Sequence, residues 1–443
     1  MPTVKLQYDQ NMINIKNIFS ARRLFYSTIA IAIFGTTGMV SCSDDDLGPS
    51  IYDTNNYPLD RTVYTFPLDT FVKKNFLEPY NLKYIYKMED VGTDMQKNLV
   101  PATYEKSVDL AVLTKYLWLD VYKKMAGEGE VFLKKYSPRI IHVIGSPGYN
   151  SDGSRTVGVA EGGLKVTLME VNRLDVNQIE GNRGLNELFF HTMHHEFGHI
   201  LDQTVLRPTA FNTISSGLYD AMGWAEKSDT IQAGLGFVTP YGSSQAGEDW
   251  VETLACYVTY DQDRWDKLLN TAQYDWEEVD YTLEDYQANY PRAYAEYLSG
   301  YARQTQNYDT IGYLRETANY EYKLVRKVVP RNANGFVALD ADGNYTVSTD
   351  LDNIDGRATI LEKLDLVRTW LKENWDISID SLRKEVQTRQ YVTDANGNFL
   401  RDSRGNFINH LTYHDPANPE QPSIIEKLLQ EVEEYKKLQT EAK

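Results

Sequence analysis

The stretch HTMHHEFGHILDQTVL, residues 191–206, contains the pattern H-E-x-x-H at His195, Glu196 and His199. Residues four apart in a helix lie on one face, so a helix here would direct both histidine side chains toward one metal ion. Histidine nitrogens bind Zn²⁺ at roughly 2.0–2.1 Å, and a glutamate beside the ion can take a proton from a bound water. The pattern therefore predicts a zinc site with Glu196 next to the metal.

The apolar residues around the motif predict the helix that this interpretation requires. They recur at the spacing of one helical face, at Leu185, Leu188, Phe189, Met193, Phe197, Ile200 and Leu201. An amphipathic helix with surface histidines would show the same periodicity. We favour the metal site because the whole motif lies inside the helix and a further candidate ligand follows it.

The third ligand is expected on a later helix. A catalytic zinc site has three protein ligands, and the metzincin continuation is excluded because the chain has Asp202 and Val205 where that motif has glycine and histidine. Glu248 and Glu252 lie four residues apart, on one face of a predicted helix. One can bind the metal while the other accepts the second N–H of a ligand histidine, and the spacing leaves open which does which.

The first 41 residues have the pattern of a signal peptide. Basic residues precede a mostly apolar run, 25–34, which is shorter than the roughly 20 residues that span a bilayer. The sequence Gly-Met-Val-Ser before Cys42 resembles the lipobox of bacterial lipoproteins, and this resemblance implies cleavage before Cys42 and its acylation. The alternative is an ordinary secretory signal whose cleavage site lies near a cysteine. The acidic run 43–46 resembles the export signal of surface lipoproteins of Bacteroidetes, or is a solvated tail.

The overall composition restricts the partners. The formal net charge is −18, which argues against nucleic acid, because phosphate backbones attract basic surfaces. Hydrophobic residues make up 42% of the 443 residues, enough for a substantial core. Apart from Cys42 there is one cysteine, Cys256 in an apolar run, so the fold is expected to need no disulfide.

The chain divides into four predicted parts. These are a lipoprotein signal peptide at 1–41, a flexible tether at 42–60, a metallopeptidase domain at 61–390 with an insertion at about 330–356, and an extension of hairpin and helix at 391–443. Within the domain, 139–145 is predicted as a buried strand and 156–171 as a hairpin turning at 161–163. Residues 265–301 and 313–329 are predicted to be helical.

The extension carries two similar loops, DANGNF at 394–399 and DSRGNF at 402–407. Aspartate, asparagine and glycine at these offsets either ligate Ca²⁺ or form hairpin turns that tolerate positive φ. The twelve-residue calcium loop with its closing glutamate is missing, so we favour turns.

The combination of H-E-x-x-H, Asp202 and Glu248-x-x-x-Glu252 resembles the gluzincin clan, with a catalytic motif similar to that of the anthrax lethal factor. The whole layout, including the lipoprotein start and the tail 361–383, resembles zinc-binding metallopeptidase lipoproteins of Bacteroidetes. The likeness covers about 62–300 and 357–390. It implies an α+β, zincin-like fold: a small mixed sheet with an edge strand, the H-E-x-x-H helix, and a mostly helical C-terminal half.

This resemblance also assigns roles. Glu248 becomes the third zinc ligand and Glu252 its outer partner, although spacing still permits the reverse. Tyr241, seven residues before Glu248, becomes a hydrogen-bond donor to the oxyanion, or is an ordinary core or surface tyrosine. Asp202 is a second-shell carboxylate or a surface residue of the helix. In peptidases of this type an edge strand, expected near 165–169, pairs with extended substrate.

The sequence leaves two alternative hypotheses for the function. The first is a surface zinc endopeptidase in which the metal activates water and Glu196 is the general base, acting on protein, peptide or glycoprotein. The second is a surface lipoprotein that binds zinc and a glycan or glycoprotein with little or no turnover. Both readings place the chain on the outer membrane through a lipid anchor at Cys42, exposed at the cell surface.

Overall fold

The computed structural model describes residues 63–88, 98–149, 155–156, 158–161, 164–289, 312–317, 321–330, 333–334, 341 and 352–440. Residues Asp60–Lys443 form one compact unit, and residues 1–59, which are divided from it, lie outside the described residues. The predicted signal peptide, the lipidation site Cys42 and the tether therefore lie outside them as well. So does most of the predicted insertion at about 330–356.

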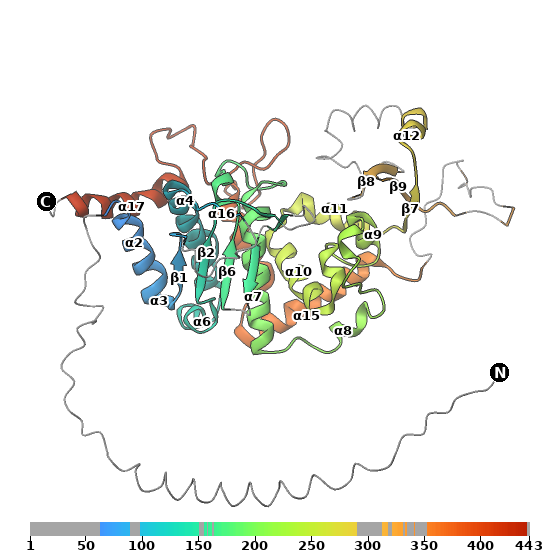
Figure 1. Ribbon diagram of the computed structural model, residues 1–443, viewed down its shortest axis with the longest axis horizontal. Coiled ribbons are helices and arrows are strands. Elements are labelled where there is room, and N and C mark those ends of the chain that lie inside the picture. The colour runs from blue at the N-terminus through green and yellow to red at the C-terminus, as the bar shows by residue number, and fades with distance from the viewer. Residues whose placement is uncertain are drawn as a thin grey trace, which may run out of the picture. The chain divides into compact units, whose positions relative to one another are not determined.

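The second unit contains a four-stranded mixed sheet (Figure 1), in the order β1-β2-β6-β5. Its strands are β1 (Lys83–Ile85), β2 (Ile140–Val143), β5 (Gly158–Glu161) and β6 (Lys165–Leu168). The first three strands in the order are parallel, and β5 runs antiparallel to β6. The predicted strand at 139–145 is β2, whose run of apolar residues is that of a strand buried within a sheet.

The prediction of an edge strand at 165–169 is wrong in one respect. Strand β6 is paired on both sides, since Thr167 is opposite His142 of β2 and Val159 of β5. The chain turns back between β5 and β6 as a hairpin, as predicted, and β5 occupies the edge. Strand β6 does contact the motif helix (Figure 1). Strand addition by a substrate would therefore use β5.

The helices before the motif begin with α2 (Phe66–Val72), a π-helical turn at Lys73–Leu77 and α3 (Glu78–Tyr80). A long helix follows as α4 (Tyr104–Thr114), a π-helical stretch at Lys115–Leu119 and α5 (Asp120–Met125), and then comes α6 (Gly129–Tyr136). The side chain of Thr103 caps α4 by accepting from Lys106 N, which fixes where the helix starts. The C-terminal helix α17 (Ile424–Thr440) packs on α2 and α4, so the extension belongs to this compact unit.

Helix α7 (His191–Thr204) carries the motif and continues from a π-helical stretch at Asn186–Phe190. Helix α10 (Ala246–Thr259) packs along α7 and carries the two glutamates. Helices α15 (Gly356–Trp375) and α16 (Ile379–Gln390) pack on α10. The shorter helices are α8 (Phe211–Ile214), α9 (Asp229–Gly234), α11 (Gln262–Ala272) and α12 (Leu283–Asn289).

The helical prediction for 265–301 and 313–329 is partly wrong. A three-stranded antiparallel sheet has the order β7-β9-β8, with β7 (Trp276–Asp280), β8 (Gly312–Glu316) and β9 (Tyr322–Lys327). Short segments without glycine or proline are ambiguous between helix and strand, and the hydrogen bonds that decide come from residues far away in the chain. Leu314 and Leu324 are buried against Tyr286 of α12, which gives this sheet its own small core.

The two loops of the extension form turns. Bridges join Thr393 to Phe399 and Arg401 to Phe407, and Gly397 and Gly405 have φ of 83° and 87°, which glycine adopts at little cost. The preceding aspartates accept hydrogen bonds from backbone N–H groups within their own loops. This geometry agrees with the interpretation as hairpin turns.

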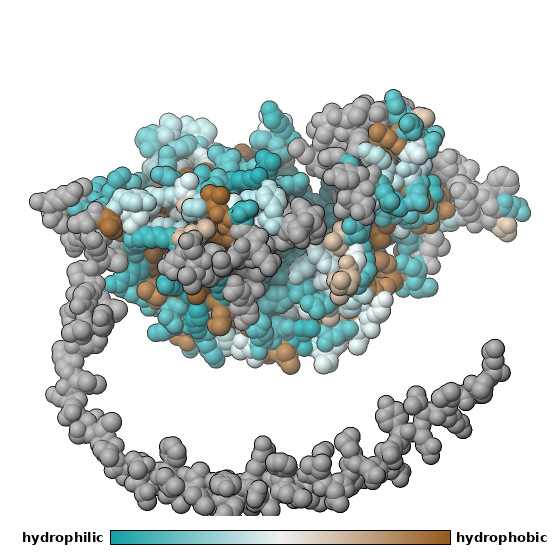
Figure 2. Space-filling model, in the orientation of Figure 1, coloured by the Kyte–Doolittle hydropathy of each residue, from teal (hydrophilic) through white to brown (hydrophobic). Residues whose placement is uncertain are grey.

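The surface is mainly polar. Figure 2 shows hydrophilic residues over most of the described surface on this face, with hydrophobic residues singly or in small groups. Among the described residues, no helix combines the length and the apolar character that crossing a bilayer needs.

Candidate zinc-peptidase site

The contact between α7 and α10 depends on a glycine inside the motif. A Cβ added to Gly198 would lie 3.0 Å from Cγ1 of Val251 and 3.2 Å from its Cβ. Val251 lies between Glu248 and Glu252 on α10, so the glycine lets α10 approach α7 where both glutamates face the histidines. Gly198, the second variable position of the motif, is therefore part of the packing that assembles the site.

The structure brings His195, His199 and Glu248 together. Glu248 Oε2 lies 3.1 Å from His195 Nε2 and 3.2 Å from His199 Nε2, and the three ligand atoms all lie within 4.8 Å of one another. Tetrahedral ligands at roughly 2.0–2.1 Å from zinc are about 3.3 Å apart. These residues therefore fit a zinc ion that is bound by two imidazoles and one carboxylate.

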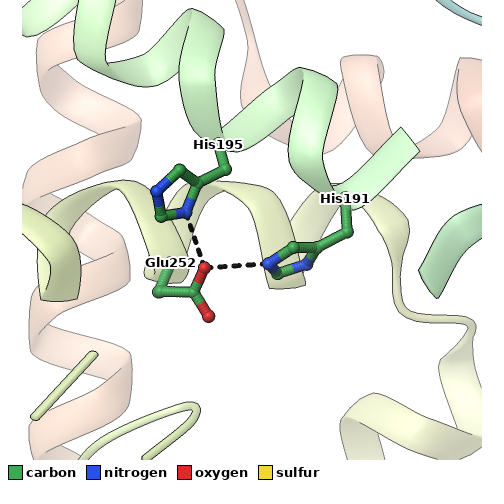
Figure 3. Close-up of side chains that lie close together, drawn as sticks. All are labelled: His191, His195 and Glu252. Atoms are coloured by element: carbon green, nitrogen blue, oxygen red, sulfur yellow. Dashed lines mark hydrogen bonds and ion pairs between the residues drawn. The ribbon is translucent and has the colours of Figure 1, made fainter. Parts of the chain in front are cut away.

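Glu252 holds the other side of His195, as Figure 3 shows. Its Oε1 lies 2.6 Å from His195 Nδ1 and 2.8 Å from His191 Nε2. An ionised carboxylate only accepts, so Nδ1–H of His195 donates and the lone pair of that ring remains on Nε2, the nitrogen that faces Glu248. This geometry favours Glu248 as ligand and Glu252 as its outer partner over the reverse assignment that the spacing had left open.

A second group of possible ligands is His191, His195 and Glu252. It uses Nδ1 of His195, the nitrogen that donates to Glu252, whereas the first group uses Nε2. Each nitrogen of the Glu252 group already has a hydrogen-bond partner in Glu252. We therefore infer that His191 and Glu252 support the zinc ligand His195 and that this group is not a second metal site.

The pKa shifts in the site follow from buried opposite charges. Burial lowers the pKa of His195, but hydrogen bonds to Glu248 and Glu252 outweigh this effect and raise the pKa to about 9. Burial raises the pKa of Glu248 and Glu252, yet the neighbouring histidines hold both well below their usual range. Both carboxylates are therefore ionised at neutral pH, the state that binds metal and accepts hydrogen bonds.

Glu196 lies beside the three candidate zinc ligands, and no described residue occupies its carboxylate. Its carboxylate forms no hydrogen bond or ion pair within the described part of the chain. Burial raises its pKa, and the nearby charges of His195 and His199 only partly offset this. A carboxylate with a raised pKa that is not otherwise bound is suited to accept and return a proton near neutral pH.

Tyr241 lies over the face of His195. Its ring centroid is 5.8 Å from that of His195 at an interplanar angle of 29°, and the ring of Trp224 makes an edge contact with it, with the centroids 4.9 Å apart. Burial and the charge of Glu248 raise the pKa of Tyr241, so its hydroxyl stays protonated and can donate. The predicted role as a donor beside the metal is compatible with this position.

Two residues near the motif have structural roles. Asp202 accepts from the backbone N–H of Arg207 at 2.7 Å and pairs with the guanidinium of the same residue. Both bonds support the turn after α7, and neither partner is a ligand histidine, which differs from the predicted second-shell role. The side chain is also buried, which differs from the alternative of a surface residue. His194 is buried and bonds to the hydroxyl of Tyr122 at 2.9 Å, and burial lowers its pKa to about 3.

Sequence reasoning missed how α10 is held in place. Lys363 of α15 forms an ion pair of 2.7 Å with Asp249, which is next to Glu248, and both side chains are fully buried. Nζ of Lys363 also donates to Gly236 O, and Tyr219 donates to Asp249. The sequence gives no sign of this pair, because the two residues are more than a hundred positions apart.

Comparison with known protein families shows where the chain belongs. The model of a family described as "Putative zinc-binding metallo-peptidase" matches residues 62–380. The chain belongs to this zinc-binding metallopeptidase family. The predicted family, the α+β zincin-like fold and the cofactor Zn²⁺ are thereby confirmed.

One solved structure of this zinc-binding metallopeptidase type, from Bacteroides caccae, carries the same description. It is 29% identical, and the match covers 73% of this chain and 91% of that one with a TM-score of 0.48. A search of the curated proteins finds no match.

Proposed function

We propose that this family member is a zinc-dependent endopeptidase. One observation carries the proposal: Glu248 Oε2 lies 3.1 Å from His195 Nε2 and 3.2 Å from His199 Nε2. The carboxylate of Glu196, which forms no hydrogen bond or ion pair with the described residues, lies beside these three atoms. Two imidazoles and one carboxylate leave a position open for water or substrate, which is the arrangement of catalytic and not of structural zinc sites.

Each residue has a chemical task in this proposal. Zinc bound in such a site supplies a Lewis acid that lowers the pKa of water to about 7 and polarises a carbonyl. Glu196 accepts a proton from the attacking water and delivers it to the leaving amine. Tyr241 donates a hydrogen bond to the carbonyl oxygen as negative charge develops there.

We further propose the location and substrates. The lipobox-like sequence before Cys42 supports a lipid anchor in the outer membrane, and the acidic run after it supports exposure at the cell surface. A surface enzyme of this type would act on protein, peptide or glycoprotein. The net charge of −18 supports the absence of nucleic acid among its partners.

Cleavage by the full-length, zinc-loaded chain tests the function. Casein and mucin-type glycopeptides are incubated with the protein, with and without a zinc chelator, and the products are identified by mass spectrometry. We expect internal cleavage that stops with the chelator and returns with zinc. The Glu196→Gln chain, with its zinc content measured in parallel, is the matched control.

The same experiment addresses the second function. One zinc per chain without cleavage of a broad peptide library would contradict the endopeptidase proposal. It would favour a surface protein that binds glycan or glycoprotein without turnover.

A further inference from the structure

The carboxylate of Glu252 is bound by three donors from two separate parts of the chain. Figure 3 shows Oε1 between His195 and His191, both on α7. The other oxygen, Oε2, accepts from the hydroxyl of Thr239 at 2.6 Å. Glu252 is buried, and hydrogen bonds to a buried carboxylate are among the stronger ones in proteins.

The hydroxyl of Thr239 makes a second hydrogen bond. Its oxygen accepts from the backbone N–H of Gly242 at 3.1 Å, which closes the turn that begins the 3₁₀ segment Tyr241–Ser244. Tyr241 lies inside this turn. Gly242 packs directly on α10, where an added Cβ would meet Asp249 Cα at 3.5 Å and Glu252 Cβ at 3.6 Å.

One hydroxyl group thus connects the two halves of the site. Its hydrogen is donated to the carboxylate that orients His195, and its lone pair holds the turn that places Tyr241 over the same histidine. A hydroxyl can do both because it is donor and acceptor at once. An ionised carboxylate only accepts and an ammonium group only donates, so neither could make both bonds.

We propose that Thr239 is a positioning residue that fixes the Tyr241 turn and the Glu252–His195 pair in one geometry. His191 completes this arrangement as the third donor to Glu252. The inference rests on the proposed peptidase function for its catalytic part only, because the support of His195 also governs how zinc is held.

The first experiment compares substitutions within the turn. Thr239→Val keeps the shape but removes both hydrogen bonds, and Thr239→Ser keeps the hydroxyl. Ser243→Ala removes a neighbouring hydroxyl that donates to Pro240 O within the same turn and is not among the hydrogen-bond donors to Glu252. For each full-length chain, zinc release to a chromogenic chelator and kcat and KM for a peptide are measured.

The valine variant is expected to release zinc about 10- to 100-fold faster and to lose kcat in the same range with little change in KM. The serine variant is expected to restore both quantities, and the alanine variant at 243 to match the parent. A purely structural role would not separate serine from valine in this way. Unchanged zinc release and unchanged kcat in Thr239→Val would overturn the proposal, as would a serine variant no better than valine.

A double-mutant cycle tests the connection to Tyr241. If Thr239 places that side chain, the loss of kcat from Thr239→Val is smaller in a Tyr241→Phe chain than in the parent. Additive losses would contradict the coupling. If the valine chain does not fold by circular dichroism, Thr239→Ala is used for the same comparison.

Failure of this inference and failure of the proposed function have different signatures. If the parent chain binds zinc but cleaves no peptide, the function fails, while the order of zinc-release rates still decides whether Thr239 supports His195. If the parent cleaves peptide and Thr239→Val releases zinc at the parental rate, the function stands and this inference is wrong.

Discussion

The α7–α10 site and the sheet β7-β9-β8 are both rich in charged pairs, but the pairs differ in surroundings. In the site, Glu252 is buried and its carboxylate accepts from three side chains. In the sheet, Arg326 of β9 pairs with Glu277 of β7 at 2.7 Å, and the two side chains are 36% and 41% exposed. Opposite charges at similar distances therefore exist in two very different environments.

This difference determines what each pair contributes. An exposed pair competes with water and salt and is worth about 0.2–1 kcal/mol. A buried pair costs desolvation, and removing one partner leaves an unpaired buried charge. The buried pairs of the site therefore cost desolvation free energy but fix the positions of their side chains. Metal binding and catalysis require such fixed positions. The following four predictions test this contrast, from the largest expected effect to the smallest.

Glu196→Gln should have the largest effect. The amide has nearly the shape of the carboxylate but cannot accept a proton, so we expect kcat to fall by up to about 10⁴-fold. Bound zinc should remain at the parental level, because Glu196 is not among the three converging ligands. Peptide cleavage and metal analysis on the same sample measure this. Full activity of the variant would remove Glu196 from the role of base.

Lys363→Met should destabilise the fold. It leaves the buried Asp249 without its cation, so that the carboxyl either stays charged and unpaired or takes up a proton, and we expect a cost of about 3–5 kcal/mol of unfolding free energy. Chemical denaturation measures this loss. Lys372→Met is the matched control on the same helix: its pair with Asp376 is exposed, and the cost should stay within about 0.5 kcal/mol. Equal losses in both variants would break the comparison between buried and exposed pairs.

Glu252→Gln should weaken zinc binding by about 10- to 100-fold, since an outer partner orients the ligand histidine without touching the metal. Glu248→Gln, four residues earlier on the same helix, should bind zinc more weakly still, because it removes a ligand. Competition with a zinc indicator ranks the two variants. The opposite ranking would exchange the roles of the two glutamates.

Arg326→Gln in the three-stranded sheet should have the smallest effect. The loss of its exposed pair with Glu277 is expected to cost less than about 1 kcal/mol, and the cost should shrink further at high salt. Thermal unfolding at low and high ionic strength measures both. A cost close to that of Lys363→Met would show that exposure does not control these pairs.

Much of the candidate site could be predicted because helix geometry is local. The spacing of His195 and His199 defines one face of a helix whatever surrounds it, and the same holds for Glu248 and Glu252. The prediction that one glutamate binds and the other supports agrees with the geometry. Which glutamate binds the metal and which supports His195 depends on where along α7 helix α10 packs, and Gly198 sets that contact.

The errors come from contacts between distant residues. The stretch that contains β8 and β9 has no glycine or proline at its centre, and its pattern predicts a helix, but the backbone of β9 pairs with strand β7 almost fifty residues earlier. The inner position of β6 was missed for the same reason, since only β5 folding back makes it an inner strand. Thr239 belongs to no motif, and nothing in its neighbourhood indicates the carboxylate that it binds.

The sequence alone determined the chemistry that this chain can offer: two imidazoles one helical turn apart, a glutamate between them, and a pair of carboxylates on a second helix. These follow from local backbone geometry, which a few neighbouring residues fix. Only the tertiary structure decided which carboxylate faces Nε2 of both motif histidines, which hydroxyl binds the other carboxylate, and which lysine neutralises Asp249. Such partners are chosen by the packing of separate helices, where burial makes every unpaired polar group costly.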